Sequence, residues 1–351
     1  MANSSTARDG GAVRLYRGPQ DAADPLAPTA RWTLSQFYRD WFLPHCRVGG
    51  ENPSSPKTIE QEWVQVHRWQ EITGDPPLGQ ITQELCRRFV EQLRNLPRAN
   101  GRPRSPNTVA KAVTHLQTIL NAAGRPLRPD KPGVGVLAEV PRFPRPRRVE
   151  AAKKDIWRLD EIERLLTACL AARSTSNLCG VPADWWWQSI VLWIYNTGLR
   201  IENTILATWD MVDRDEPSWI TIPRSIYKGR SHGHFLFVNP WARAAIDRIR
   251  SPALAQLFPW LHWPASASWL QRCFERIVAA SGLPLHRRFK FHALRGACGS
   301  QLGRINGTAA DLVLGHRGRN LRIDCYTDPQ VMVEALMKLP QPRFVRQRTL
   351  F

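Results

Sequence analysis

Six residues in the second half of this 351-residue chain have the types and the order needed to break a phosphodiester bond without a metal ion. Such a reaction needs a nucleophile, positive charge beside the non-bridging oxygens, and an acid that protonates the leaving oxygen. Arginine suits the phosphate, because its planar guanidinium stays charged and donates two parallel hydrogen bonds. A tyrosine hydroxyl, with an ordinary pKa of about 10, attacks once its proton leaves. The six residues are Arg200, Lys228, His292, Arg295, His316 and Tyr326.

The cationic and imidazole members lie in short motifs. Arg200 follows Thr-Gly-Leu, and Lys228 lies between a tyrosine and a Gly-Arg pair. His292 and Arg295 form a His-x-x-Arg pair, and His316 follows Leu-Gly. Taken singly, each motif is more typical of a solvated side chain or of a structural histidine than of a catalyst. Their occurrence together, in order and in a basic chain, indicates one shared site.

The nucleophile is chosen among only five tyrosines. Tyr16 lies in a polar N-terminal tail, and Tyr38 and Tyr195 fall within apolar helical patterns that predict burial. Tyr227 adjoins the candidate lysine and stays open as an alternative nucleophile. Tyr326 lies on a polar segment after a Gly-His pair, where exposure favours it as the nucleophile.

The charge of the chain indicates a polyanionic partner. Lys and Arg number 49 against 30 Asp and Glu, which gives a formal net charge of +19. An excess of this size favours nucleic acid, bound through the release of counterions. No apolar run approaches the roughly 18 residues that a membrane span needs, and the N-terminus has no secretory pattern. The seven cysteines include no Cys-x-x-Cys pair, so we expect reduced thiols and a cytoplasmic protein.

Metal chemistry is disfavoured by the sequence. Two-metal nucleases and transposases need clustered carboxylates, and here the acids are few and dispersed. His232 and His234 alternate as strand neighbours do, but no third ligand is near in sequence. We therefore predict no metal and no cofactor, and expect these two histidines to contact solvent or DNA.

The chain divides into four predicted segments. They are a disordered tail (1–30), a helical DNA-binding domain (31–125), a basic proline-rich linker (126–154) and a catalytic domain (155–351). Four helices of the first domain are predicted from their N-cap residues and the apolar spacing that follows. These caps are Thr33, Ser55, Thr82 and Ser105.

The catalytic domain is predicted to be mainly α-helical with a small antiparallel sheet, so the fold class is mainly α (α+β). Asp160 and Glu163 have the spacing of a capping box at its first helix. A buried helix spans 185–196, and the Trp185-Trp186-Trp187 run on it is predicted to pack in the core rather than on bases. Strands at 218–223 and 233–238 form a hairpin that carries Lys228 near its tip. Helices follow at 269–280, 294–302 and 308–314, and a short last one begins at Asp328.

From Thr33 onward, these motifs resemble the tyrosine recombinase (phage integrase) family. The resemblance implies a core-binding and a catalytic domain that clamp duplex DNA, a 3′-phosphotyrosine intermediate, a free 5′-hydroxyl, and no cofactor. It implies that Tyr326 attacks, that Arg200 and Arg295 hold the phosphate, and that Lys228 is the general acid. His292 and His316 then assist proton transfer and phosphate binding.

The resemblance also implies a homotetramer on two DNA sites. The segment after Asp328 is then expected to pack on a neighbouring subunit through apolar side chains. The candidates for that contact are Val331, Val333, Leu336 and Met337.

Three features depart from the family pattern. The interval from His316 to Tyr326 is one residue longer than usual. The acid that commonly follows the first arginine is replaced by Asn203, with Glu202 one position earlier. Gly296-Ala297 stands where His-Thr is common after the second arginine.

Three basic residues outside the site are candidate DNA contacts: Arg104 and Lys111, which flank the helix start at Ser105, and Arg230. Two other functions stay open. One is a type IB topoisomerase-like enzyme that nicks and relaxes DNA as a monomer, and the other is a DNA-binding regulator of the same fold that has lost cleavage.

Overall fold

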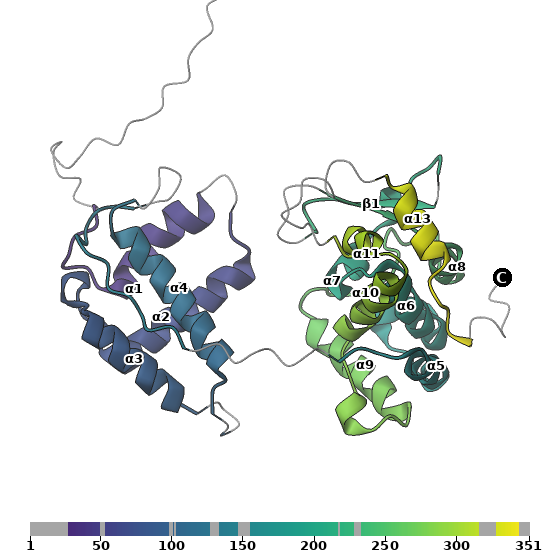
Figure 1. Ribbon diagram of the computed structural model, residues 1–351, viewed down its shortest axis with the longest axis horizontal. Coiled ribbons are helices and arrows are strands. Elements are labelled where there is room, and N and C mark those ends of the chain that lie inside the picture. The colour runs from purple at the N-terminus through teal and green to yellow at the C-terminus, as the bar shows by residue number, and fades with distance from the viewer. Residues whose placement is uncertain are drawn as a thin grey trace, which may run out of the picture. The chain divides into compact units, whose positions relative to one another are not determined.

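The computed structural model describes residues 27–49, 53–97, 101, 103–126, 133–146, 155–216, 218–227, 233–315 and 328–343. The chain forms two compact units, 1–151 and 152–351 (Figure 1). Both are built mainly from helices, and the one described sheet has two antiparallel strands. The predicted fold class is therefore confirmed.

The first unit is a small helical bundle in which all four predicted N-caps are confirmed. Each cap hydroxyl accepts the backbone N–H three residues later, over 3.1–3.3 Å. The α-helices are α1 (Leu34–Phe37), α2 (Pro56–Thr73), α3 (Gln83–Asn95) and α4 (Pro106–Ala123). A π-helical segment (Tyr38–Val48) continues α1, and a 3-10 turn (Leu78–Gln80) precedes α3.

Part of the expected linker packs on the first unit. Residues 133–146 have no helix, as their prolines predict, but Leu137 and Phe143 are buried in the core of this unit. The Phe143 ring lies 5.8 Å from that of Trp69 and 5.7 Å from that of Phe89. Proline content alone cannot show that two apolar side chains in such a segment will find a core.

Helix α6 is the central helix of the second unit. This helix is buried almost all round and packs against α8 and α10. The helices are α5 (Leu159–Ala168), α6 (Ala183–Thr197), α7 (Ile201–Leu206), α8 (Pro240–Arg248), α9 (Ala267–Ala280), α10 (His292–Ile305), α11 (Gly307–Leu314) and α13 (Gln330–Met337). Strands β1 (Trp219–Ile222) and β2 (His234–Phe237) pair from Trp219 opposite Phe237 to Ile222 opposite His234. The 3-10 turns are Cys169–Ala171, Ser176–Leu178, Trp209–Met211 and Leu285–Arg287.

The tryptophan run on α6 is mainly a core element, as predicted. Trp186 and Trp187 are buried and pack on one another with ring centroids 4.9 Å apart. Trp185 is 40% exposed, and the guanidinium of Arg248 lies over its ring at 4.6 Å. The face of α6 that meets α8 therefore ends in a cation–π contact.

The predicted capping box of α5 is wrong. Asp160 and Glu163 do not form it; the carboxylate of Glu161 reaches back to the backbone N–H of Arg158 at 2.8 Å. Glu161 is nearly buried and is also held by Arg287, whose Nε and Nη2 donate to its two oxygens at 2.6 and 2.7 Å. That long-range ion pair selects which acid caps the helix, and local spacing cannot reveal it.

The segment after Asp328 packs within its own chain. Helix α13 lies beside α11 (Figure 1) and also contacts α10 and β2. Leu336 is fully buried there. The backbone carbonyl of Leu336 accepts Asn239 Nδ2 at 3.1 Å. Leu336 was therefore wrongly expected at a neighbouring subunit; Met337, on the same helix, is 44% exposed.

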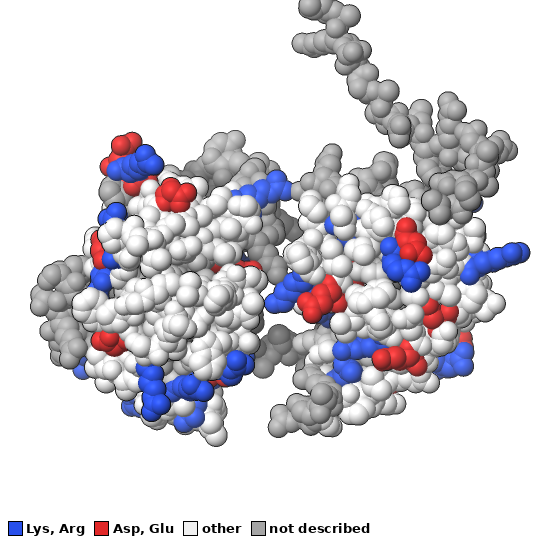
Figure 2. All heavy atoms as spheres, turned by 180° about the vertical axis from the view of Figure 1, so that it is seen from behind, with Lys and Arg blue, Asp and Glu red and all other residues white. Residues whose placement is uncertain are grey.

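Acidic and basic side chains are interspersed over the described surface that Figure 2 shows. The six cysteines within the described ranges carry free thiols. No helix among the described residues is both long and apolar enough to span a bilayer.

Candidate active site

Arg200 is positioned by the end of α6. Gly198 closes this helix in the left-handed conformation (φ 61°), and Leu199 is buried directly after it. Arg200 then becomes the N-cap residue of α7 with extended backbone. Its Nη1 is buried and has no hydrogen-bond partner among the described residues. A buried guanidinium nitrogen without a partner is costly, so this donor is suited to an anion.

Arg295 joins three segments of the second unit. It lies on α10, is 3% exposed, and donates through Nη1 to the carbonyl oxygen of Gly198. Its Nη2 donates to the carbonyl oxygen of Leu314 at 2.6 Å. Gly198 stands two residues before Arg200, and Leu314 two residues before His316. One buried guanidinium therefore fixes the backbone beside two other predicted site residues.

His292 begins α10 one helical turn before Arg295. Residues three apart share a helix face, so His292 lies on the side from which Arg295 reaches out. His292 is exposed, whereas Arg295 is buried. The imidazole of His292 therefore lies at the surface, one helical turn from the guanidinium of Arg295 in the interior.

The Leu314–Gly315 turn is held by two ring side chains. Gly315 ends α11 in the left-handed conformation (φ 54°). The hydroxyl of Tyr227 donates to the Leu314 carbonyl at 3.4 Å, and His234 Nε2 lies 3.1 Å from the Val313 carbonyl. The rings of Tyr227 and His234 stack with centroids 4.7 Å apart.

The prediction that His234 contacts solvent or DNA is wrong. It is 7% exposed and is bound to α11 from β2. The two-residue period of a strand explains this, because Leu236 is buried on the same face. Its predicted companion His232 lies outside the described residues.

Asn203, which occupies the position of the family's acid, is a buried link to the hairpin. Its Nδ2 donates to the carbonyl oxygen of Ile226 at 2.7 Å, and its Oδ1 has no partner within the described part of the chain. Ile226 stands two residues before Lys228. The backbone that leads into the predicted lysine is therefore tied to α7, which Arg200 caps.

Four predicted residues lie outside the described ranges: Lys228, Arg230, His316 and Tyr326. The backbone on the near side of Lys228 and of His316 is described, and the Tyr227 hydroxyl bond to Leu314 joins the two. The structure thus brings together Arg200, Arg295 and the segments that lead into Lys228 and His316.

The three described tyrosines are poor nucleophiles. Tyr38, Tyr195 and Tyr227 are each 1% exposed or less, and each hydroxyl donates to a backbone carbonyl. Burial raises the pKa of Tyr38 to about 12, with the Glu62 carboxylate adding to the effect, and burial also raises the pKa of Tyr195. The burial predicted for Tyr38 and Tyr195 is confirmed. Tyr227, the alternative nucleophile, is buried as well.

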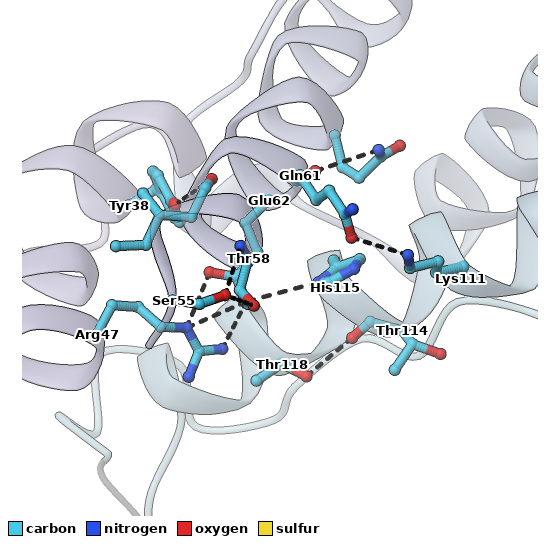
Figure 3. Close-up of polar contacts among 12 residues, drawn as sticks. Tyr38, Arg47, Ser55, Thr58, Gln61, Glu62, Lys111, Thr114, His115 and Thr118 are labelled. Atoms are coloured by element: carbon cyan, nitrogen blue, oxygen red, sulfur yellow. Dashed lines mark hydrogen bonds and ion pairs between the residues drawn. The ribbon is translucent and has the colours of Figure 1, made fainter. Parts of the chain in front are cut away.

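The two described DNA-contact candidates lie near the start of α4. Lys111 is exposed, and its Nζ donates to Gln61 Oε1 of α2 at 2.8 Å (Figure 3). Arg104 is half-buried, and its Nε has no partner among the described residues. Their roles as DNA contacts stay predictions.

The residues that sequence reasoning did not assign to the site are Asn203, Tyr227 and His234 in their structural roles. The available signal for Asn203 was its position three residues after Arg200, where the family commonly has an acid. Stacking across a hairpin has no local signal. Within the described ranges, no group of three His, Cys, Asp or Glu side chains is placed to hold a metal ion.

Comparisons with known proteins show the family and the fold of this chain. The model of the phage integrase family matches residues 157–330. No curated protein sequence matches the chain. Solved structures similar to the chain include an integrase of the Tn1549 transposon in complex with a circular intermediate DNA (15% identity, TM-score 0.59, 88% of this chain and 99% of that chain).

Two lambda integrase structures are similar as well. One is a tetramer bound to a Holliday junction (15% identity, TM-score 0.53, 85% of this chain and 78% of that chain). The other is a dimer bound to a core site (16% identity, TM-score 0.50, 79% and 73%). At these identities the likeness shows a shared fold, and the family model covers the segment that carries the arginine, histidine and hairpin motifs. The chain therefore belongs to the phage integrase family and is a tyrosine-type site-specific DNA recombinase.

Proposed function

We propose that Tyr326 attacks a phosphodiester of duplex DNA and forms a 3′-phosphotyrosine bond while the 5′-oxygen leaves as a hydroxyl. Arg200 and Arg295 hold the non-bridging oxygens, and Lys228 protonates the leaving oxygen. His292 and His316 share protons and bind the phosphate. The covalent bond keeps the energy of the broken one, so the 5′-hydroxyl of a partner strand can reverse the step and rejoin DNA.

The observation that carries this proposal is the binding of Arg295 to the carbonyls of Gly198 and Leu314. These two contacts hold the backbone within two residues of Arg200 and of His316. The Nη1 of Arg200, which is buried and has no partner among the described residues, adds a donor suited to a phosphate oxygen. Arginines at a transferring phosphoryl group contribute roughly 10³- to 10⁵-fold in rate in other enzymes, so a fixed pair is a large part of the catalysis.

We further propose that the active assembly is a homotetramer on two DNA sites, because exchange between two duplexes needs four strand cleavages. Among the similar structures, a lambda integrase tetramer is bound to a Holliday junction. The exposed Met337 and the half-buried Val331 and Val333 of α13 are available for contact with a neighbouring copy. The segments 31–125 and 155–351 are proposed as the DNA-binding and catalytic domains of this cytoplasmic enzyme.

The test is a suicide duplex, nicked next to the cleavage position and built from inverted repeats that flank the coding region. The nicked strand loses its 5′-hydroxyl end by diffusion, so the covalent intermediate accumulates. The wild-type protein should form a denaturation-resistant adduct in excess chelator. Tyr326→Phe should bind the same duplex and form none.

Two results would count against the proposal. An adduct that persists in Tyr326→Phe would move the nucleophile elsewhere, and a requirement for divalent metal would remove the mechanism. Relaxation of a plasmid that lacks the repeats, by a monomer, would instead favour a topoisomerase-like activity.

A further inference from the structure

The first unit carries an open groove of about 770 Å³ between α4 and the extended segment 133–146, here called the α4 groove. Helix α4 lines it with hydroxyl and amide side chains, those of Thr114, Gln117, Thr118 and Asn121. The cationic lining residues are Arg125, Arg142 and Arg145. Among the described residues that line it there is no Asp or Glu.

The three arginines of the α4 groove are exposed and have no ion pair within the described part of the chain. Arg87 on α3 shows the contrast, because it is paired with Glu84 at 2.7 Å and with Glu91 at 3.0 Å. The groove therefore concentrates positive charge that the described protein does not neutralise. Such a surface attracts a polyanion.

The wall that carries Arg142 is held by two glutamines. Gln83 of α3 donates to the carbonyl of Arg142 at 2.5 Å and accepts its backbone N–H at 2.9 Å. Gln117 of α4 donates to the carbonyl of Pro141 at 3.1 Å and accepts the N–H of Phe143 at 2.9 Å. The backbone of three consecutive residues is thus fixed by paired hydrogen bonds.

Two apolar contacts complete this support. Phe143 is 4% exposed and packs in the core of the first unit. Val140 fills the space that a side chain at Gly124 would need, so the end of α4 and the segment can approach closely. An extended segment tied down at these points presents its arginines at a set spacing, and little chain entropy is lost when a ligand binds.

We propose that the α4 groove binds the phosphodiester backbone of duplex DNA, with Arg142 and Arg145 on the phosphates and with Gln83 and Gln117 as positioning residues. This inference rests on the proposed function. Arginine forks and threonine hydroxyls are suited to phosphate oxygens, and such contacts orient a protein on DNA without reading its sequence. The groove therefore sets the register of the first unit on the duplex.

The experiment is the salt dependence of DNA binding by the full chain carrying Tyr326→Phe, measured by fluorescence anisotropy on a labelled duplex of mixed sequence. Each phosphate contact contributes about 0.9 to the slope of log K against log salt concentration. Arg142→Ala with Arg145→Ala should therefore reduce the slope by about 1.8. The matched control, Arg88→Ala with Arg94→Ala, removes the same charge from exposed positions of α3 that do not line the groove.

A control pair that flattens the slope as much as the groove pair, or a groove pair that leaves it unchanged, would overturn the proposal. Because cleavage is absent in the Tyr326→Phe background, this result is independent of the adduct assay. If the wild-type protein forms no adduct but the groove pair flattens the slope, the proposed cleavage mechanism fails and the proposed DNA contact at the α4 groove stands. If the adduct forms but the groove pair leaves the slope unchanged, only the proposed DNA contact at the α4 groove fails.

The positioning role of Gln83 is tested by a substitution that leaves the charge unchanged. Gln83 is exposed, so Gln83→Ala should fold normally and still weaken binding several-fold. In a protein that already lacks Arg142 and Arg145, the same change should have no further effect, because Gln83 acts through these arginines. An equal loss of affinity in both backgrounds would show that Gln83 has no positioning role.

Discussion

Arg295 and Leu314 are joined by a hydrogen bond of 2.6 Å, from a guanidinium on α10 to the last carbonyl of α11. The same guanidinium donates to the carbonyl of Gly198, the residue that ends α6. Arg295 is thus both a candidate phosphate ligand and a brace between the segments that lead into Arg200 and His316. Its replacement has structural and chemical effects that need to be measured separately.

Arg295→Lys should abolish most cleavage while DNA binding is retained. The lysine keeps the charge but cannot hold two carbonyls and face a phosphate with a planar fork. We expect single-turnover cleavage to fall by about 10³-fold or more. The comparison is Arg304→Lys, an exposed position near the end of the same helix, which should cleave at the wild-type rate. Normal cleavage in Arg295→Lys would show that the fork is not needed.

Gly315→Ala should destabilise the second unit. The added methyl group would meet the Tyr227 hydroxyl, and the residue would have to keep a φ of 54°. Gly303→Ala is the control, because Gly303 lies exposed on α10 with open space around it, so alanine there should be neutral or slightly stabilising.

A second change isolates the contact. Tyr227→Phe removes the hydroxyl, so it should recover part of the Tm that Gly315→Ala loses. The thermal melts of the four proteins of this cycle provide the measurement. Strict additivity of the two changes would show that Tyr227 and Gly315 are not in contact.

Asn203→Ala should lower cleavage more than DNA binding, since the Nδ2 bond to Ile226 holds the backbone that leads into Lys228. Loss of a buried hydrogen bond costs about 1–2 kcal/mol of unfolding free energy. Thr204→Val is the matched neighbour, because the buried Thr204 hydroxyl has no partner among the described residues and its removal should be harmless. Equal effects of the two changes on cleavage would argue against a link through Ile226.

Glu62 should stabilise the first unit in a pH-dependent way. This carboxylate is 1% exposed, accepts Arg47 at 2.6 and 2.8 Å, and lies 3.5 Å from His115 Nδ1 (Figure 3). Burial alone would raise the pKa of Glu62, but the hydrogen bonds from His115 and Arg47 outweigh it and lower that pKa below its usual value.

A lowered pKa stabilises the fold above the usual glutamate value of about 4.3, and the contribution is lost as the pH falls through the lower folded value. Glu62→Gln should therefore cost about 3 kcal/mol near neutral pH, and the difference from wild type should shrink below about pH 4. Urea unfolding at several pH values measures it, with the exposed Glu60→Gln as control. A deficit that stays constant into acid would contradict the role of the charge.

Local signals predicted much of the fold. The caps at Thr33, Ser55, Thr82 and Ser105 were correct because a hydroxyl that accepts an N–H three residues later depends only on neighbouring backbone. The cap predicted for α5 was wrong, because it depends on the pairing of Glu161 with Arg287, which lies 126 positions later in the chain.

In the candidate site, too, local motifs could be predicted from the sequence and long-range contacts could not. Arg200 and Arg295 could be identified from their motifs, and the structure places both around the turn at Gly198. The packing of Tyr227 and His234 against the end of α11 could not, because it depends on how a hairpin meets a helix 79 to 87 residues later in the chain. Sequence motifs thus indicate candidate catalytic side chains, and tertiary contacts show which residues hold the backbone beside them.

The most direct measurement is peptide mapping, by mass spectrometry, of the covalent adduct that the wild-type protein forms with the suicide duplex. We expect one modified peptide, with the 3′-phosphate of the cleaved strand esterified to the Tyr326 oxygen and a free 5′-hydroxyl on the released strand. A phosphate found on Tyr227 or on any other residue, or a bond to a 5′-phosphate, would contradict it.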